Sequence, residues 1–130
     1  YTIRQLCQEM HDLYVSFNVK DLQKAMFRQE SLPAVVMNPQ DANQEYIRGN
    51  VELVRIRDAE GRIAAEGALP YPPGVLCVVP GEVWGGAVQR YFLALEEGIN
   101  MLPGFSPELQ GVYSEKDADG IKRLYGYVLK

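Results

Sequence analysis

Residues 67–82 read Gly-Ala-Leu-Pro-Tyr-Pro-Pro-Gly-Val-Leu-Cys-Val-Val-Pro-Gly-Glu, and we expect the rest of the chain to be organised around this stretch. Its first three prolines fix their own φ angle and favour extended geometry in the residues before them, which predicts a rigid corner. Gly74 and Gly81 allow an unusual φ or a close approach of two backbone segments. The corner holds Tyr71 and Glu82 in fixed places and delivers Glu82 to the start of a long helix. A purely structural corner explains the same residues equally well.

Strand-like runs of residues surround this corner. Residues 51–57 alternate in polarity, residues 58–61 (Asp-Ala-Glu-Gly) form a turn signal, and residues 62–69 form a second extended run. Residues 75–79 form a third, continuous apolar run. We therefore predict a hairpin over the first two runs and one central sheet that contains all three.

Amphipathic helices are predicted on both sides of these strands. Thr2-Ile3-Arg4-Gln5 is a capping-box sequence, which begins an N-terminal helix of about four turns. Its apolar face contains Ile3, Leu6, Cys7, Met10, Leu13, Tyr14 and Phe17. Shorter helices are expected within residues 18–29 and 41–48.

A long helix is predicted to begin at Val83 and to end at Gly98. Its apolar stripe contains Trp84, Ala87, Val88, Tyr91, Phe92 and Leu95, whereas Gln89, Arg90, Glu96 and Glu97 are expected to face solvent. The chain then predicts a C-terminal hairpin over residues 112–116 and 121–129, with its turn at Asp119-Gly120. Helices, a small sheet and a terminal hairpin within residues 1–130 indicate a single domain of the α+β class.

The corner also carries a resemblance to a known family. Pro-Tyr-Pro-Pro-Gly at 70–74, followed by an apolar run and Pro-Gly-Glu at 80–82, resembles the C-terminal domain of the bacterial ornithine/lysine/arginine decarboxylases. Residues 83–105 are most similar to the ornithine decarboxylases, and the resemblance covers essentially the whole chain. These are pyridoxal-phosphate enzymes of the aspartate-aminotransferase fold type.

The resemblance implies an accessory domain, residues 1–130, of a longer cytoplasmic enzyme that converts L-ornithine to putrescine and CO2 in polyamine biosynthesis. Its partners are expected to be the catalytic domains of its own parent protein, which assembles as a homodimer or larger homo-oligomer. The domain would pack on the catalytic domains and help form the active-site channel. Tyr71 and Glu82 are then candidates for attracting a cationic amino-acid substrate in that channel.

The same resemblance argues against catalysis within this chain. The family holds its cofactor through a lysine in a Ser-x-His-Lys context, and none of the lysines here follows a histidine: Lys20, Lys24, Lys116, Lys122 and Lys130. We therefore expect pyridoxal 5'-phosphate in the parent enzyme, and neither catalytic nor cofactor-binding residues in residues 1–130.

Other sites receive weak support from the sequence. His11 is the only histidine, which argues against a metal site with two histidines. A Cys7–His11 pair has helical spacing, but we expect Cys7 and Cys77 to be buried free thiols. Residues 116–120 faintly resemble a calcium loop, although a hairpin turn explains them better.

Composition also limits the choice of partner. The 17 acidic against 13 basic residues argue against nucleic-acid binding, and we expect no membrane span or signal peptide. A chain that starts with tyrosine is expected to be a piece of something larger. Two alternatives stay open: a free-standing binding or regulatory module, and a small enzyme in its own right.

Overall fold

The computed structural model describes residues 1–71, 74–102 and 104–130, so Pro72 and Pro73 of the predicted corner lie outside the described residues. The helical elements are α1 (Ile3–Ser16), α2 (Val19–Met26), η1 (Gln29–Ser31), α3 (Pro39–Ile47), η2 (Ile56–Asp58) and α4 (Gly86–Met101). The strands are β1 (Val51–Arg55), β2 (Leu69–Pro70), β3 (Leu109–Gln110), β4 (Tyr113–Lys116) and β5 (Lys122–Leu129). The predicted α+β class is confirmed.

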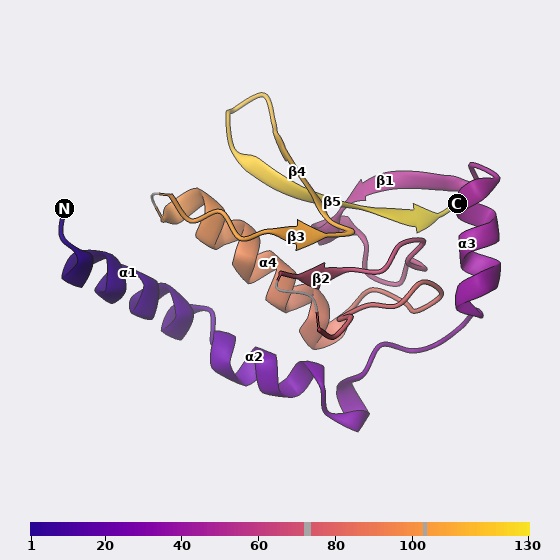
Figure 1. The fold of residues 1–130 in the computed structure, drawn as a ribbon, viewed down its shortest axis with the longest axis horizontal. Helices are drawn as coiled ribbons and strands as arrows, with labels where there is room; N and C mark the ends of the chain where they lie inside the picture. Colours follow the sequence, from indigo (N-terminus) through magenta and orange to yellow (C-terminus); the bar gives the residue numbers. More distant parts are fainter. Residues whose placement is uncertain (72–73, 103) are drawn as a thin grey trace.

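Helix α4 lies between the sheet and the N-terminal helices α1 and α2, and the two chain ends lie at opposite sides of the molecule (Figure 1). The predicted capping box is present on α1, because the Thr2 hydroxyl accepts from Gln5 N at 3.2 Å and the Gln5 side chain accepts from Thr2 N at 2.8 Å. Among the described residues, no helix is both long and apolar enough to cross a membrane.

The three-stranded sheet has the order β1-β5-β4 and is antiparallel. The predicted C-terminal hairpin is confirmed as β4 and β5, but the predicted hairpin over residues 51–57 and 62–69 is wrong, since β1 pairs with β5 instead. After Arg55 the chain enters η2, because Ile56 turns into the core, where it is fully buried.

The second and third predicted strands form isolated bridges instead of a shared sheet, except that Leu69 is part of the short strand β2. Ala64 bridges Val128 of β5, and Ala68 bridges Val78 on the other arm of the corner. The two-residue strand β2 pairs with β3 from the other end of the chain. Small buried alanines allow this segment to lie close against its neighbours. Residues 62–69 therefore pack into the core as an irregular segment and do not form a regular strand.

The core lies between α4 and the inner face of the sheet. Its largest fully buried side chains are Trp84, Phe92, Ile56, Leu124, Val78, Val88 and Val128. The Trp84 and Phe92 rings meet edge to face with centroids 5.5 Å apart, which is a favourable arrangement of two aromatic quadrupoles. Burial of each such ring contributes roughly 1.5–3 kcal/mol.

The long helix begins and ends later than the sequence predicts. Trp84 is in the core but precedes α4, which starts at Gly86 and continues past Gly98 to Met101. Gly98 is therefore not a C-terminal cap. A Cβ at this position would lie 2.8 Å from the Phe105 ring, so the glycine is needed for close packing of the chain that follows the helix.

Candidate functional site

The two arms of the predicted corner are tied together at their base. Ala68 N donates to Val78 O and Cys77 N donates to Ala68 O, both at 2.9 Å. Tyr71 N donates to Glu108 O at 2.7 Å, whereas 48% of the Tyr71 residue surface is exposed. The backbone thus fixes the position of Tyr71 and leaves its side chain open to a neighbour.

Glu82 closes the turn at the end of the corner. Its Oε1 accepts from Val79 N at 2.6 Å, and its own backbone N donates to Val79 O at 3.0 Å. The turn needs glycine at position 81, because a Cβ there would lie 2.2 Å from Met37 O. Glu82 precedes the first residue of α4 by four positions, so the predicted delivery of Glu82 to the helix start is wrong, and the helix dipole does not explain this carboxylate.

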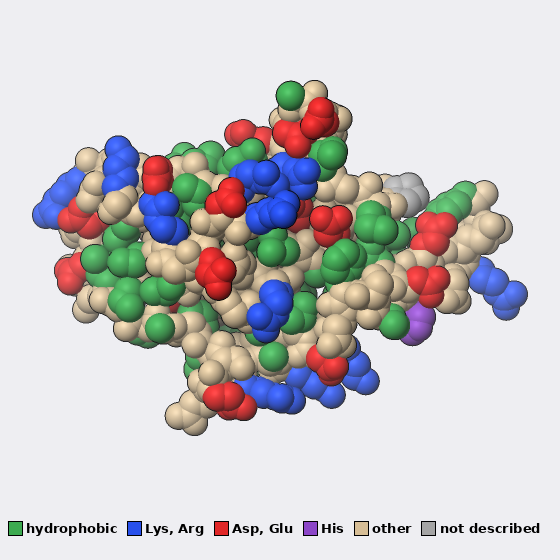
Figure 2. All heavy atoms as spheres, turned by 180° about the vertical axis from the view of Figure 1, so that it is seen from behind, with side chains coloured by type: hydrophobic (Ala, Val, Ile, Leu, Met, Phe, Trp, Pro, Cys, Tyr) green, Lys and Arg blue, Asp and Glu red, His purple; other side chains and the backbone are tan. Residues whose placement is uncertain are grey.

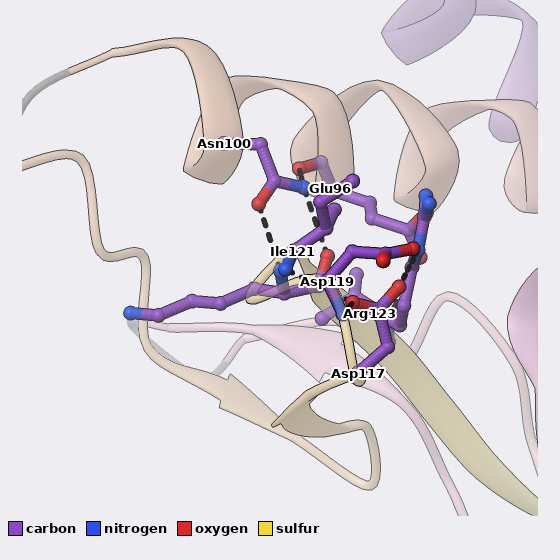
Figure 3. Close-up of polar contacts among 8 residues, drawn as sticks. Glu96, Asn100, Asp117, Asp119, Ile121 and Arg123 are labelled. Carbon is purple, nitrogen blue, oxygen red and sulfur yellow. Dashed lines mark hydrogen bonds and ion pairs between the residues drawn. The ribbon is translucent and has the colours of Figure 1, made fainter.

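A second polar cluster joins α4 to the beginning of β5 (Figure 3). Asn100 Nδ2 donates to Lys122 O at 2.8 Å, and Asn100 Oδ1 accepts from Lys122 N at 2.9 Å. Glu96 Oε2 accepts from Leu124 N at 2.9 Å. Strand β1 pairs with β5 only from Tyr125 onward, which leaves the backbone of Lys122 and Leu124 without a partner strand on that side. The side chains of Asn100 and Glu96 supply the hydrogen-bond partners there instead.

Arg123 extends this cluster into the hairpin turn. Its guanidinium lies 3.5 Å from Glu96 Oε1 and donates to Asp117 Oδ2 at 3.2 Å, as Figure 3 shows. Asp117 Oδ1 accepts from Asp119 N and Ile121 N at 2.9 and 3.0 Å. Burial raises the pKa of Asp117, but these hydrogen bonds outweigh it and lower the pKa below its ordinary value. The cluster stabilises the fold and offers no nucleophile.

The sequence analysis missed this cluster because it placed Glu96 on the solvent side. Only 3% of the surface of Glu96 is exposed. Val88, Phe92, Glu96 and Asn100 form one row at i, i+4 spacing, and the first two are in the core. That row was the sequence signal for the burial of Glu96, because a carboxylate in line with core residues is itself buried and needs a hydrogen-bond partner. Gln89, also predicted to face solvent, is buried and donates to Ile56 O at 2.9 Å.

Three tyrosines surround a carboxylate at the other end of the sheet. Tyr46 of α3 and Tyr113 of β4 both meet Tyr127 of β5 edge to face, with ring centroids 5.5 and 5.7 Å from it. The Tyr113 hydroxyl lies 2.8 Å from both carboxylate oxygens of Glu66. Burial and this hydrogen bond raise the pKa of Tyr113 to about 12. A carboxylate beside aromatic rings is the combination that the sequence analysis sought at Tyr71 and Glu82.

A cavity of about 550 Å³ lies between α2 and α4, a size typical of pockets that hold small ligands or the side chains of a neighbouring domain. Its apolar lining is Phe17, Leu22, Leu93 and Ala94, and its polar lining is Asn18, Arg57, Arg90, Arg123, Glu96 and Glu97. The lining contains no lysine, cysteine or histidine, so this cavity suits an apolar group with a charged end and lacks a nucleophile.

The described residues do not provide a site for pyridoxal phosphate. Lys20, Lys24, Lys116 and Lys130 are exposed. Lys116 and Lys122 line a hollow of about 380 Å³, whose lining residues include no carboxylate that could pair with the cofactor ring nitrogen. The described residues therefore do not fit the cofactor by themselves.

The described part of the chain forms no metal site, and its buried cysteine is not activated. No three His, Cys, Asp or Glu side chains lie close enough there to hold a metal ion. Cys77 is buried as predicted, and burial raises the pKa of its thiol, which disfavours the reactive thiolate. Cys7 is exposed, so the prediction that both thiols are buried is wrong for this residue.

Comparison with known proteins gives a consistent result. The family "Orn/Lys/Arg decarboxylase, C-terminal domain" matches residues 20–130. The constitutive ornithine decarboxylase of Escherichia coli K12 is 90% identical over 130 residues, which cover all of this chain and 18% of that protein. The ornithine decarboxylase of Haemophilus influenzae is 71% identical over 129 residues, which cover 99% of this chain and 18% of that protein.

The fold is also shared with solved structures. The constitutive lysine decarboxylase of E. coli aligns with a TM-score of 0.80 at 33% identity, over 98% of this chain and 18% of that one. This chain thus spans less than a fifth of the length of the relatives it matches. It belongs to the family of Orn/Lys/Arg decarboxylase C-terminal domains.

Proposed function

We propose that this chain is the accessory C-terminal domain of a pyridoxal-phosphate-dependent ornithine decarboxylase, which converts L-ornithine to putrescine and CO2 in the bacterial cytoplasm. The observation that carries the proposal is the 90% identity to a constitutive ornithine decarboxylase along the whole chain. An inducible lysine decarboxylase of E. coli is 38% identical, over 88% of this chain and 16% of that protein, which favours ornithine as the substrate of the parent.

In this proposal the rest of the parent protein holds the cofactor, which supplies the electron sink for loss of CO2. The lysines of this chain support the assignment of the cofactor to the rest of the parent protein. They are exposed or line a hollow without a carboxylate for the cofactor ring nitrogen. A parent that forms a homodimer or larger homo-oligomer completes the proposal. The match to one end of a longer enzyme supports this reading over a free-standing binding module.

The role proposed for this domain is to pack on the catalytic domains and to form part of the wall of the substrate channel. Tyr71 offers an exposed aromatic ring on a fixed backbone, and Glu82 offers a half-buried carboxylate nearby in the sequence. An aromatic face and a negative charge both attract the ammonium groups of ornithine and putrescine.

The experiment replaces Glu82 with glutamine in the intact enzyme. Glutamine retains an Oε1 that can accept from Val79 N, so the turn is kept while the charge is removed. Glu115→Gln, an exposed carboxylate on β4, is the matched control. We expect kcat/KM for ornithine to fall in Glu82→Gln and to lose part of its salt dependence, and both to stay unchanged in the control.

Two results would count against the proposal at different levels. Unchanged kcat/KM and unchanged salt dependence in Glu82→Gln would remove Glu82 from the channel but leave the accessory role intact. An intact parent protein that releases no CO2 from ornithine, and releases it instead from lysine or arginine, would overturn the proposed substrate.

A further inference from the structure

The rest of the domain covers only half of the apolar stripe of helix α1. At about 100° per residue, its apolar side chains occupy one continuous side of the helix. Leu6, Met10 and Leu13 line hollows shared with Leu102 and with residues 104–107, so this half of the stripe faces the body of the domain. Ile3 and Tyr14 lie on the other half and are 80% and 37% exposed, and Cys7 beside them is exposed as well.

The packing of α1 against the domain is loose. Leu13 is the only buried residue among the 14 of the helix. Hollows of about 480 and 350 Å³ lie between α1 and the residues after α4. Figures 1 and 2 both show α1 projecting beyond the body of the molecule toward its N-terminus. An isolated helix of this length is only marginally stable in water, so α1 needs a further surface to stabilise it.

Helix α1 lies outside the family match but inside the longer alignments. The family match begins at Lys20, after the last residue of α1, whereas the ornithine decarboxylase relative aligns along the whole chain. Helix α1 therefore lies outside the family match, but the alignment with the constitutive lysine decarboxylase, which covers 98% of this chain, includes it as well. In the relatives most of the polypeptide lies outside the region that matches this chain, which leaves ample chain to cover the exposed half of the stripe.

We propose that the exposed half of the α1 stripe, formed by Ile3, Cys7 and Tyr14, is a docking surface for the preceding part of the same polypeptide. Helix α1 then acts as a bridge: one half of its stripe packs on this domain and the other half packs on the catalytic domains. This inference rests on the proposed function and deepens it, since it names the surface through which the accessory domain is attached.

Cys7 is a built-in probe of this surface. In the intact native enzyme, a maleimide reagent is added and the modified cysteine is identified by peptide mass spectrometry. We expect Cys7 to react at least tenfold more slowly in the native protein than after unfolding. The control variant Gln8→Cys places a thiol about 100° around the helix on the exposed polar side, and this thiol should react equally fast in both states. Rapid labelling of Cys7 in the native enzyme would overturn the inference.

A matched pair of variants tests the energetic contribution. Tyr14→Glu places a charge on the proposed docking side, whereas Val15→Glu places the same charge on a neighbouring position that is 64% exposed on another side of the helix. In the intact enzyme we expect Tyr14→Glu, but not Val15→Glu, to increase the labelling rate of Cys7 at least tenfold. Equal effects of the two variants would contradict a specific docking side.

The remaining question is whether the cover comes from the same chain or from a second copy. A photo-crosslinking residue at position 3 in the intact enzyme distinguishes the two on a denaturing gel. Crosslinked peptides recovered from the single-chain band support the inference, and crosslinked products of double mass would overturn it in favour of a second copy. The test is separate from the proposed function, because an enzyme that decarboxylates ornithine with a freely accessible Cys7 would refute only the docking surface.

Discussion

Removal of the Glu96 carboxylate should destabilise this domain far more than removal of a neighbouring one. In Glu96→Ala, the buried N–H of Leu124 loses its acceptor, which costs about 1–3 kcal/mol. The one buried methylene group that is removed contributes about 0.8 kcal/mol. Arg123 is partly exposed and keeps Asp117, so the lost ion pair adds only about 0.5 kcal/mol. The expected total is about 2–4 kcal/mol, a large share of the stability of a small domain.

Two further variants separate the parts of this sum. Glu96→Gln keeps an acceptor for Leu124 N and should cost about 1 kcal/mol, mainly through the lost charge beside Arg123. Glu97→Ala removes the adjacent, less buried carboxylate and should cost under about 0.5 kcal/mol. Urea unfolding of the 130-residue chain, followed by Trp84 fluorescence and circular dichroism, measures all three. A Glu96→Ala cost below 1 kcal/mol, or an equal cost for Glu96→Gln, would refute the reasoning.

Two other outcomes follow from the ionisable groups. The pKa of Tyr113 is raised to about 12 in the folded chain, so its contribution to stability is complete below the unfolded pKa of about 10 and is lost as the pH rises toward 12. The hydrogen bond to Glu9 also raises the pKa of Tyr1 to about 12. An ultraviolet titration should therefore show one fewer late-titrating tyrosine in Tyr113→Phe than in the unaltered chain, and an unchanged number would contradict the Glu66 contact. In the 130-residue chain Cys7 should react with a thiol reagent at least tenfold faster than buried Cys77, and equal rates would contradict the burial described here.

Features specified by short-range sequence were predicted correctly. The capping box at Thr2 and Gln5 starts α1, and the Asp119-Gly120 turn joins β4 to β5, because each depends on residues within a few positions of one another. The aromatic stripe around Trp84 and Phe92 is in the core as expected. Such signals are readable without knowledge of the tertiary structure.

Features that depend on distant partners were not predictable in the same way. Residues 51–57 and 62–69 look like neighbouring strands, yet β1 pairs with β5 from the end of the chain, and alternation alone does not identify the partner of a strand. The exposure of Cys7 was missed for a related reason. The apolar stripe of α1 predicts that some surface covers it, but not that this chain itself leaves Cys7 exposed.

The channel residues Tyr71 and Glu82 stay predictions. The structure gives each a fixed backbone and gives Glu82 a local hydrogen bond that the sequence did not indicate. Because this bond survives replacement by glutamine, the charge of Glu82 can be tested without loss of the turn.

The most direct test of the central claim uses the native protein from its source cells. An antibody against this domain would capture it, and its mass, its visible absorption and its release of CO2 from ornithine would be measured. A chain several times longer than 130 residues that is yellow and decarboxylates ornithine is the predicted result. A colourless protein of this length without decarboxylase activity would contradict the account and make a free-standing module the better explanation.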